Sequence, residues 1–155
     1  MALTTVSSSY ALLQPPHRLI VGNPCIPPAS AIASKDLRFG NGGRDKLCGC
    51  QSNDTLYGPT GDDYLIGGLG NDILSGGIGR DRFVLTAGSG PDLITDLTKG
   101  KDLLVLDRGL TFAQLSITQN PNAAFIRIGA NNQLLAALNG VPASASALNN
   151  FTIFG

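Results

Sequence analysis

A nine-residue repeat runs without a gap from residue 40 to residue 84, and it constrains the fold more than any other feature of the chain. All five units begin with glycine, carry aspartate at the sixth position and have an apolar residue at the eighth. Four of the five also have glycine at the fourth position. A unit this short cannot enclose a core of its own, so the repeat predicts a solenoid in which each unit stacks on its neighbours.

Each unit combines a turn with a short strand. Its first six residues are rich in glycine, which tolerates positive φ and close backbone approach, and are typical of a turn. Its last three residues centre on one apolar side chain that points inward. Two units, 18 residues in all, therefore complete one coil. Successive coils pair as parallel strands about 4.8 Å apart. This stacking predicts two facing rows of core side chains: Leu47, Leu65 and Phe83 in one sheet, and Leu56, Leu74 and Ile94 in the other.

The same stacking aligns the aspartates along the two edges of the solenoid. We expect Asp45, Asp63 and Asp81 on one edge, and Asp54, Asp72 and Asp92 on the other. Two carboxylates about 5 Å apart repel by roughly 3 kcal/mol at an effective dielectric constant of 20. Two carboxylates and the carbonyls of glycine-rich turns offer only oxygen ligands, which suit Ca²⁺ better than Mg²⁺ or a transition metal. A metal-free solenoid whose aspartates only make turns is the alternative, but it does not explain why the sixth position is never Asn or Ser.

Composition narrows the functional classes. The eleven acidic residues are all aspartate, and the formal net charge is zero, so no broad field favours nucleic acid or an anionic membrane. No apolar stretch reaches the roughly 18 residues of a membrane helix. The single histidine, His17, and the absence of glutamate exclude a zinc-protease motif, and "AGSGP" at 87–91 is not a nucleophile elbow. We therefore expect no enzymatic activity.

The three cysteines, Cys25, Cys48 and Cys50, are odd in number and irregular in spacing. They therefore do not predict a disulfide framework. Nor do further cysteines or histidines complete a zinc site around Cys48 and Cys50. We expect free thiols.

Three regions follow from these patterns. Residues 1–35 are rich in serine and proline and are expected to be a poorly ordered tail, with only weak features of a signal peptide. Residues 36–108 are expected to form the solenoid. Residues 109–155 contain the apolar runs "FAQLSIT", "AFIRI", "QLLAAL" and "FTIF" between turn signals. These runs predict short strands that cover the open end of the solenoid.

The unit consensus G-G-x-G-x-D-x-apolar-x resembles the RTX, or haemolysin-type, calcium-binding repeat. The match is tight over residues 40–84, and "GPDLITDLTKGKDLLVL" at 90–106 resembles the segment that closes the roll in this family. The C-terminal part resembles short cyanobacterial haemolysin-type calcium-binding proteins. The resemblance implies an all-β fold, a right-handed parallel β-roll with a C-terminal β-rich cap.

The resemblance also implies which residues hold the metal. Three or four calcium ions would lie between turns of successive coils, bound by the pairs Asp45–Asp63, Asp63–Asp81, Asp54–Asp72 and Asp72–Asp92. Turn carbonyls would add ligands from Gly58, Gly61, Gly67, Gly68, Gly70, Gly76, Gly77 and Gly79. Four residues depart from the glycine pattern and make the sites over 40–61 weaker matches: Asn41, Cys50, Ser52 and Pro59. Asn53, Asp62 and Asn71 at the fifth position are expected to face solvent.

The functional expectation is a secreted protein, or a module of one, that folds on meeting extracellular Ca²⁺. Millimolar calcium would saturate sites of extracellular type, and binding free energy would become folding free energy. The resemblance implies export through a type I secretion channel, with a possible signal in residues 109–155. The alternative is an adhesive or cell-surface component that uses a calcium-rigidified roll as its binding face.

Overall fold

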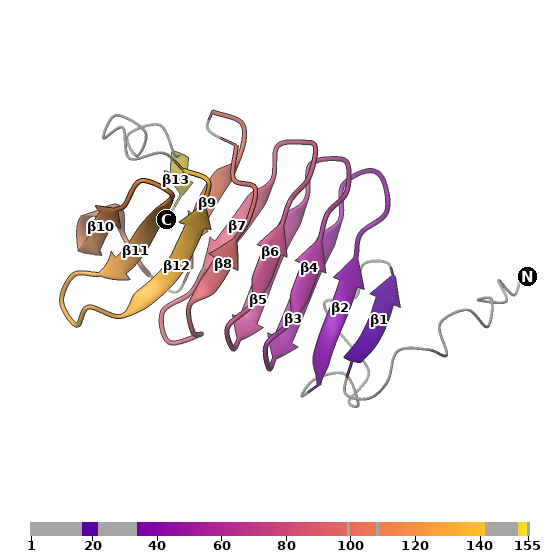
Figure 1. Ribbon diagram of the computed structural model, residues 1–155, viewed down its shortest axis with the longest axis horizontal. Coiled ribbons are helices and arrows are strands. Elements are labelled where there is room, and N and C mark those ends of the chain that lie inside the picture. The colour runs from indigo at the N-terminus through magenta and orange to yellow at the C-terminus, as the bar shows by residue number, and fades with distance from the viewer. Residues whose placement is uncertain (1–16, 22–33, 99, 108, 142–151, 155) are drawn as a thin grey trace, which may run out of the picture.

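The computed structural model of the protein describes residues 17–21, 34–98, 100–107, 109–141 and 152–154. The body is elongated, with parallel strands stacked along its length and an antiparallel cap at one end (Figure 1). It is nearly all β-structure, a β-solenoid of about four turns. The all-β roll with a β-rich cap, predicted from the repeat, is thus confirmed.

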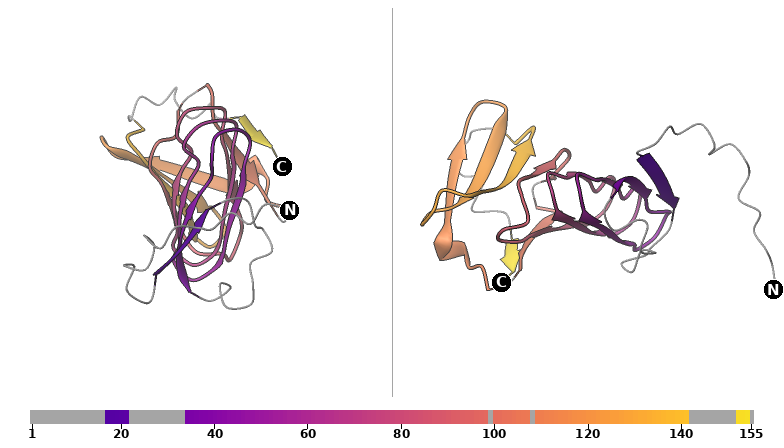
Figure 2. Two further views of the ribbon diagram at one scale, coloured as in Figure 1. Left: turned by 90° about the vertical axis from the view of Figure 1, so that its right-hand side faces the viewer. Right: turned by 90° about the horizontal axis from the view of Figure 1, so that it is seen from below.

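Two sheets form this body. The larger has eight strands, in the order β1 (His17–Val21), β2 (Lys35–Phe39), β4 (Thr55–Tyr57), β6 (Ile73–Ser75), β8 (Asp92–Ile94), β12 (Leu134–Asn139), β11 (Ala123–Ile128) and β10 (Leu115–Gln119). The smaller has five, in the order β13 (Thr152–Phe154), β9 (Leu103–Leu106), β7 (Arg82–Leu85), β5 (Tyr64–Leu69) and β3 (Lys46–Gln51). From β2 to β9 the chain alternates between the sheets, so the coils lie almost over one another when viewed along the axis (Figure 2).

The register is set by the repeat. In the smaller sheet Leu47 pairs with Leu65, Leu65 with Phe83, and Phe83 with Leu104. In the larger sheet Leu56 pairs with Leu74, and Leu74 with Ile94. These side chains are at most 1% exposed and fill a thin seam between the sheets. Both predicted core rows are therefore confirmed, and Leu104 extends the first by one coil.

The cap continues the larger sheet. Strand β12 pairs with β8 in parallel, and β11 and β10 follow in antiparallel order. Its buried side chains, among them Ile126, Leu135 and Leu138, join those of the roll in one hydrophobic core. The run "FAQLSIT" is a strand only from Leu115, because Phe112–Gln114 form a 3₁₀ turn in which the Gln114 side chain accepts from the Thr111 N–H at 2.7 Å.

The N-terminal end differs from the expected tail. Strand β1 (His17–Val21) pairs in parallel with β2, and β2 begins at Lys35, inside the region expected to be a tail. The sequence "HRLIV" lacks the glycine and aspartate signals of the repeat, so its place in the sheet could not be inferred from them. The remainder of the expected tail, 1–16 and 22–33, lies outside the described residues.

Two further observations concern cysteines and membranes. Cys48 is in a disulfide, which corrects the expectation of free thiols throughout, whereas Cys50 is a free thiol. No helix in the described part of the chain is long and apolar enough to cross a membrane.

Candidate metal centre

The sixth-position aspartates form two rows, one along each edge of the roll. In both rows the backbone N–H of one aspartate donates to Oδ1 of the aspartate in the next coil. Along the first row, here called the Asp45 edge, the N···O distances are 2.8 Å for Asp45–Asp63, 2.9 Å for Asp63–Asp81 and 3.0 Å for Asp81–Asp102. Along the second, the Asp54 edge, they are 2.7 Å for Asp36–Asp54, 2.7 Å for Asp54–Asp72 and 3.2 Å for Asp72–Asp92.

The structure thus brings together all four expected aspartate pairs and adds one at an end of each row. Neither Asp102 nor Asp36 is among the metal-site residues predicted from the sequence. A signal for Asp36 was present, because this residue lies nine positions before Asp45.

The two oxygens of each interior carboxylate have different surroundings. Oδ1 accepts the hydrogen bond described above. Oδ2 is buried without a hydrogen-bond partner in the described residues at Asp54, Asp63, Asp72 and Asp81. An unpaired charged oxygen in a protein interior is costly unless a cation or a donor meets it. Four such oxygens in stacked positions fit a bound cation.

Burial is the largest cause of the raised pKa values of these carboxyl groups in the metal-free protein. It raises the pKa of Asp54 and of Asp81 from the ordinary 3.8 to about 7 in each case. Burial, and then the charge of Asp72, raise the pKa of Asp92 to about 8. The pKa values of Asp63 and Asp72 are raised for the same first reason. Without a bound cation, Asp54, Asp81 and Asp92 therefore hold protons at a pH where ordinary aspartates are ionised.

The first glycine of each unit leaves room for the unpaired oxygen. Gly67 is buried, and a Cβ there would collide with Oδ2 of Asp72, five residues further on. The same relation joins Gly58 to Asp63 and Gly76 to Asp81. A side chain at the first position would therefore fill the space beside the carboxylate. This explains physically why the first position is glycine in every unit.

The second and fourth glycines bring the turns of successive coils close together. Gly70 has a φ of 137°, and a Cβ on it would collide with the carbonyl oxygen of Ser52 in the preceding coil. A carbonyl oxygen of the preceding coil would also collide with a Cβ at Gly61, Gly68, Gly77 and Gly79. At Gly49, a single Cβ position would meet both the carbonyl oxygen of Gly67 and Oδ2 of Asp54. Turn carbonyls therefore lie beside the carboxylates, as a cage of oxygens requires.

The unit at residues 49–57 departs from this pattern at a conformational cost. Cys50 and Ser52 adopt φ values of 86° and 79°, which favour glycine. Asn41 and Pro59, the other two departures, are not in this region of φ. Of the four departures, only the two in this unit force a side chain into a glycine conformation.

Three of the four end aspartates, Asp36, Asp45 and Asp102, have donors for Oδ2 within the chain. Oδ2 of Asp45 accepts from the Asn41 N–H at 2.9 Å, and Oδ2 of Asp102 accepts from the Thr98 N–H at 2.7 Å. Oδ2 of Asp36 accepts from the Arg38 guanidinium at 2.8 Å.

Asp96 serves the last turn of the roll differently. Its carboxylate accepts from the Gly76 N–H at 3.0 Å, the Gly77 N–H at 2.8 Å and the Ser75 hydroxyl at 2.7 Å. It therefore binds two backbone N–H groups and a hydroxyl of the preceding turn. The sequence analysis did not single out this residue.

The fifth-position side chains face outward and also link the coils. Asn53 and Asn71 are exposed, and the Asp62 side chain is 44% exposed. Oδ1 of Asn53 accepts from the Asn71 N–H at 2.9 Å, and Oδ1 of Asp62 accepts from the Arg80 N–H at 3.0 Å. These bonds reinforce the turn stacking outside the aspartate rows.

Side chains alone do not complete a metal site. The described residues contain no cluster of three or more His, Cys, Asp or Glu side chains that could hold an ion. Each site must therefore combine one or two carboxylates with backbone carbonyls. An all-oxygen set of this kind suits Ca²⁺, which takes six to eight oxygens in flexible geometry.

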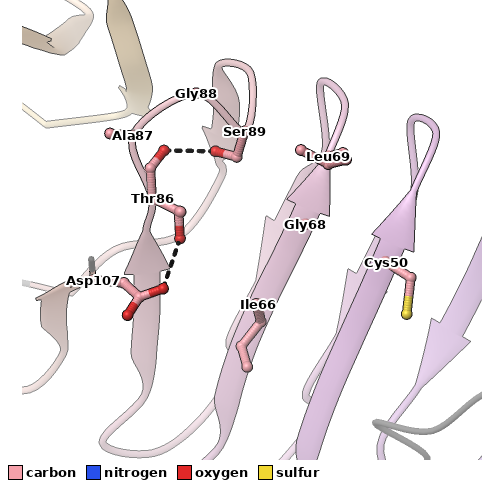
Figure 3. A pocket seen from close by; sticks show the side chains of 9 residues that line it. All are labelled: Cys50, Ile66, Gly68, Leu69, Thr86, Ala87, Gly88, Ser89 and Asp107. Atoms are coloured by element: carbon pink, nitrogen blue, oxygen red, sulfur yellow. Dashed lines mark hydrogen bonds between the residues drawn. The ribbon is translucent and has the colours of Figure 1, made fainter.

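A pocket of about 230 Å³ lies at the ends of β3, β5, β7 and β9, and includes the free thiol of Cys50 (Figure 3). The hydroxyl of Thr86 contacts Asp107 at 3.4 Å, and the hydroxyl of Ser89 donates to the Thr86 carbonyl at 2.7 Å. None of the stacked aspartates lines this pocket, but Gly68, one of the expected turn ligands, does. The pocket therefore adjoins the turns of the roll without including a carboxylate of the rows.

Comparison with known proteins agrees with this geometry. Residues 51–83 match the model of the RTX calcium-binding nonapeptide repeat (4 copies). Residues 51–83 of the chain therefore carry RTX-type calcium-binding repeats. RTX repeats bind Ca²⁺, which supports calcium as the metal of this chain.

A solved structure similar to this chain is the AlgE6R3 subunit of mannuronan C5-epimerase from Azotobacter vinelandii, determined in solution. The two are 26% identical, with a TM-score of 0.58, over 84% of this chain and 82% of that one. No curated protein sequence matches the chain. RTX repeats and the β-roll are in general calcium-binding rather than catalytic structures.

Proposed function

We propose that the RTX roll folds when Ca²⁺ binds between its coils, and that the protein acts outside the cell or at its surface. The observation that carries this proposal is the set of four buried, unpartnered Oδ2 atoms, at Asp54, Asp63, Asp72 and Asp81. Coil stacking creates these sites, so an unfolded chain does not contain them. Binding free energy is then folding free energy.

The stacking suggests three or four ions. Each would lie between consecutive turns of one edge, held by the pairs Asp45–Asp63, Asp63–Asp81, Asp54–Asp72 and Asp72–Asp92. The carbonyls of the glycine-rich turns, Gly58, Gly61, Gly67, Gly68, Gly70, Gly76, Gly77 and Gly79, would complete each shell. Flexible backbone carbonyls suit Ca²⁺, whereas Mg²⁺ requires near-ideal octahedral geometry and retains its waters.

Calcium affinity and location are linked in this proposal. Extracellular calcium modules have dissociation constants of about 10⁻⁴–10⁻³ M. A roll with sites of this strength stays unfolded in a low-calcium cytosol and folds after export. The disulfide at Cys48 supports an oxidising location. We propose export through a type I secretion channel and no catalytic activity of the chain itself.

The test is a Ca²⁺ titration of the full chain, starting in chelator and followed by circular dichroism and calorimetry. We expect β-structure to appear cooperatively near millimolar Ca²⁺, with three or four ions bound, and Mg²⁺ at the same concentration to have little effect. Asp62→Asn is the matched control, since this exposed carboxylate lies outside the rows. A chain with full native signal in chelator and no heat on adding Ca²⁺ would contradict the proposal.

A further inference from the structure

The first coil has an arginine at a core position. Strand β2 continues the repeat one unit upstream, with Asp36 at the sixth position and Arg38 at the eighth. Arg38 pairs in register with Leu56, and Leu56 with Leu74. The eighth position is apolar in all five units from 40 to 84. Arg38 nevertheless points into the same seam and is 0% exposed.

The guanidinium of Arg38 contacts the kinds of oxygen that a calcium ion would bind. Its Nη2 donates to Oδ2 of Asp36 at 2.8 Å and lies 3.5 Å from the carbonyl oxygen of Gly49. Gly49 also adjoins Oδ2 of Asp54. The guanidinium therefore lies between the first two coils at the Asp54 edge. There it contacts the Asp36 carboxylate and the Gly49 carbonyl.

Asp36 is satisfied by its own coil. Its Oδ1 accepts from the Ser34 hydroxyl at 2.9 Å, and its Oδ2 is bound by Arg38. Asp54 and Asp72, the next two aspartates on this edge, retain unpartnered Oδ2 atoms. A buried charge is stable only with a compensating charge and hydrogen bonds, and Asp36 and Arg38 provide these for one another.

We propose that Arg38 is a built-in counter-ion that closes the N-terminal end of the Asp54 edge, in place of a calcium ion between Asp36 and Asp54. The first coil is then held together at any Ca²⁺ concentration and offers a preformed surface on which the calcium-dependent coils stack. This inference rests on the proposed function only in that the coils beyond Asp54 hold calcium.

The test uses the full chain with Arg38→Leu, Asp36→Asn and the double variant. Leucine is the residue that most units carry at this position. With Arg38→Leu we expect one additional ion in calorimetry and a Ca²⁺ midpoint of folding at least about tenfold higher. In the double variant, the ion count and midpoint should return toward wild type, because the unpaired carboxylate is gone. Arg82→Leu, which removes the same charge from the outer side of β7, should change neither quantity.

Several outcomes separate the two proposals. A wild-type chain that does not respond to Ca²⁺ contradicts the proposed function. A responsive wild type with an unchanged ion count in Arg38→Leu, and with additive effects of the two substitutions, overturns the counter-ion. If Arg38→Leu does not fold even in excess Ca²⁺, the double variant decides: recovery of folding supports the charge pair, and failure indicates that Arg38 serves only packing.

Discussion

The interior and the ends of the aspartate rows solve the same electrostatic problem differently. At the ends, Oδ2 of Asp36, Asp45 and Asp102 is met by groups of the chain: a guanidinium and two backbone N–H groups. In the interior, Oδ2 of Asp54, Asp63, Asp72 and Asp81 has no partner in the described residues.

The difference follows from stacking. An interior turn has a neighbour on both sides, so its backbone amides are used in coil-to-coil hydrogen bonds and its carboxylate is left facing carbonyl oxygens. An end turn has a neighbour on one side only and can bend a local donor toward its own carboxylate. The buried oxygens without donors therefore lie where the repeat is most regular, and the chain supplies its own donors at three of the four row ends.

Gly67→Ala should have the largest effect of the changes considered. The added methyl group would occupy the place of Oδ2 of Asp72, so the carboxylate must move and the interior site is lost. We expect a loss of about 3 kcal/mol in the free energy of unfolding with Ca²⁺ present, within the range of severe single substitutions. Gly129→Ala in the cap is the control, because a Cβ there meets only ordinary contacts. Chemical denaturation measures both variants. If Gly67→Ala and Gly129→Ala lost equal free energies of unfolding, the interior turns would be no more sensitive to an added methyl group than the cap.

Asp72→Asn should act with opposite signs in the two metal states. With Ca²⁺ present, loss of a carboxylate ligand should lower the free energy of unfolding by about 2 kcal/mol. This corresponds to a calcium midpoint of folding that is roughly thirtyfold higher. In chelator, removing a buried charge should increase residual β-structure, since the amide keeps an acceptor for the Asp54 N–H. Circular dichroism with and without chelator measures both effects. The control Asp62→Asn removes only an exposed carboxylate whose Arg44 partner lies 3.8 Å away, so it should change little.

How much of this could be predicted from the sequence depends on the regularity of each part. The period placed Leu47, Leu65 and Phe83 in one row and aligned Asp54 with Asp72, because stacking dictates both. The predicted solenoid began at residue 36, but the period did not place Asp36 in an aspartate row, since Arg38 interrupts the apolar eighth position. Nor did it identify β1 or the role of Asp96, which depend on tertiary contacts of residues outside the strict repeat. Sequence periodicity therefore predicts the interior, and the ends require the structure.

Acidity should have opposite effects on the metal-free and the calcium-bound roll. Burial raises the pKa of Asp54 and of Asp81 to about 7, from an ordinary 3.8. Folded metal-free carboxyl groups thus bind protons more tightly than unfolded ones. Their contribution to stability is fully present below the unfolded pKa and is lost as the pH rises through the folded value. Calcium must displace these protons, so its midpoint should rise as the pH falls.

The measurement is the Ca²⁺ midpoint at pH 8 and at pH 6, together with the β-structure that remains in chelator. We expect a midpoint about tenfold higher at pH 6, since a proton competing at one site with a pKa near 7 changes affinity by about that factor. Residual structure in chelator should increase over the same interval. A midpoint independent of pH would mean that the interior carboxylates are not the calcium ligands.

Ser52→Gly should give the smallest effect and a gain. Ser52 has a φ of 79° in an interior turn, a conformation that costs an ordinary residue about 1–2 kcal/mol. Glycine removes this strain but costs about 0.5–1 kcal/mol in lost chain entropy, so we expect a net gain of about 0.5 kcal/mol. Asn132→Gly in the cap is the matched control: its φ is 57°, but asparagine tolerates that region and should gain nothing. Calcium-dependent thermal denaturation of both variants checks the contrast. A gain at Asn132 equal to that at Ser52 would show that the interior turns carry no strain beyond that of an ordinary hairpin.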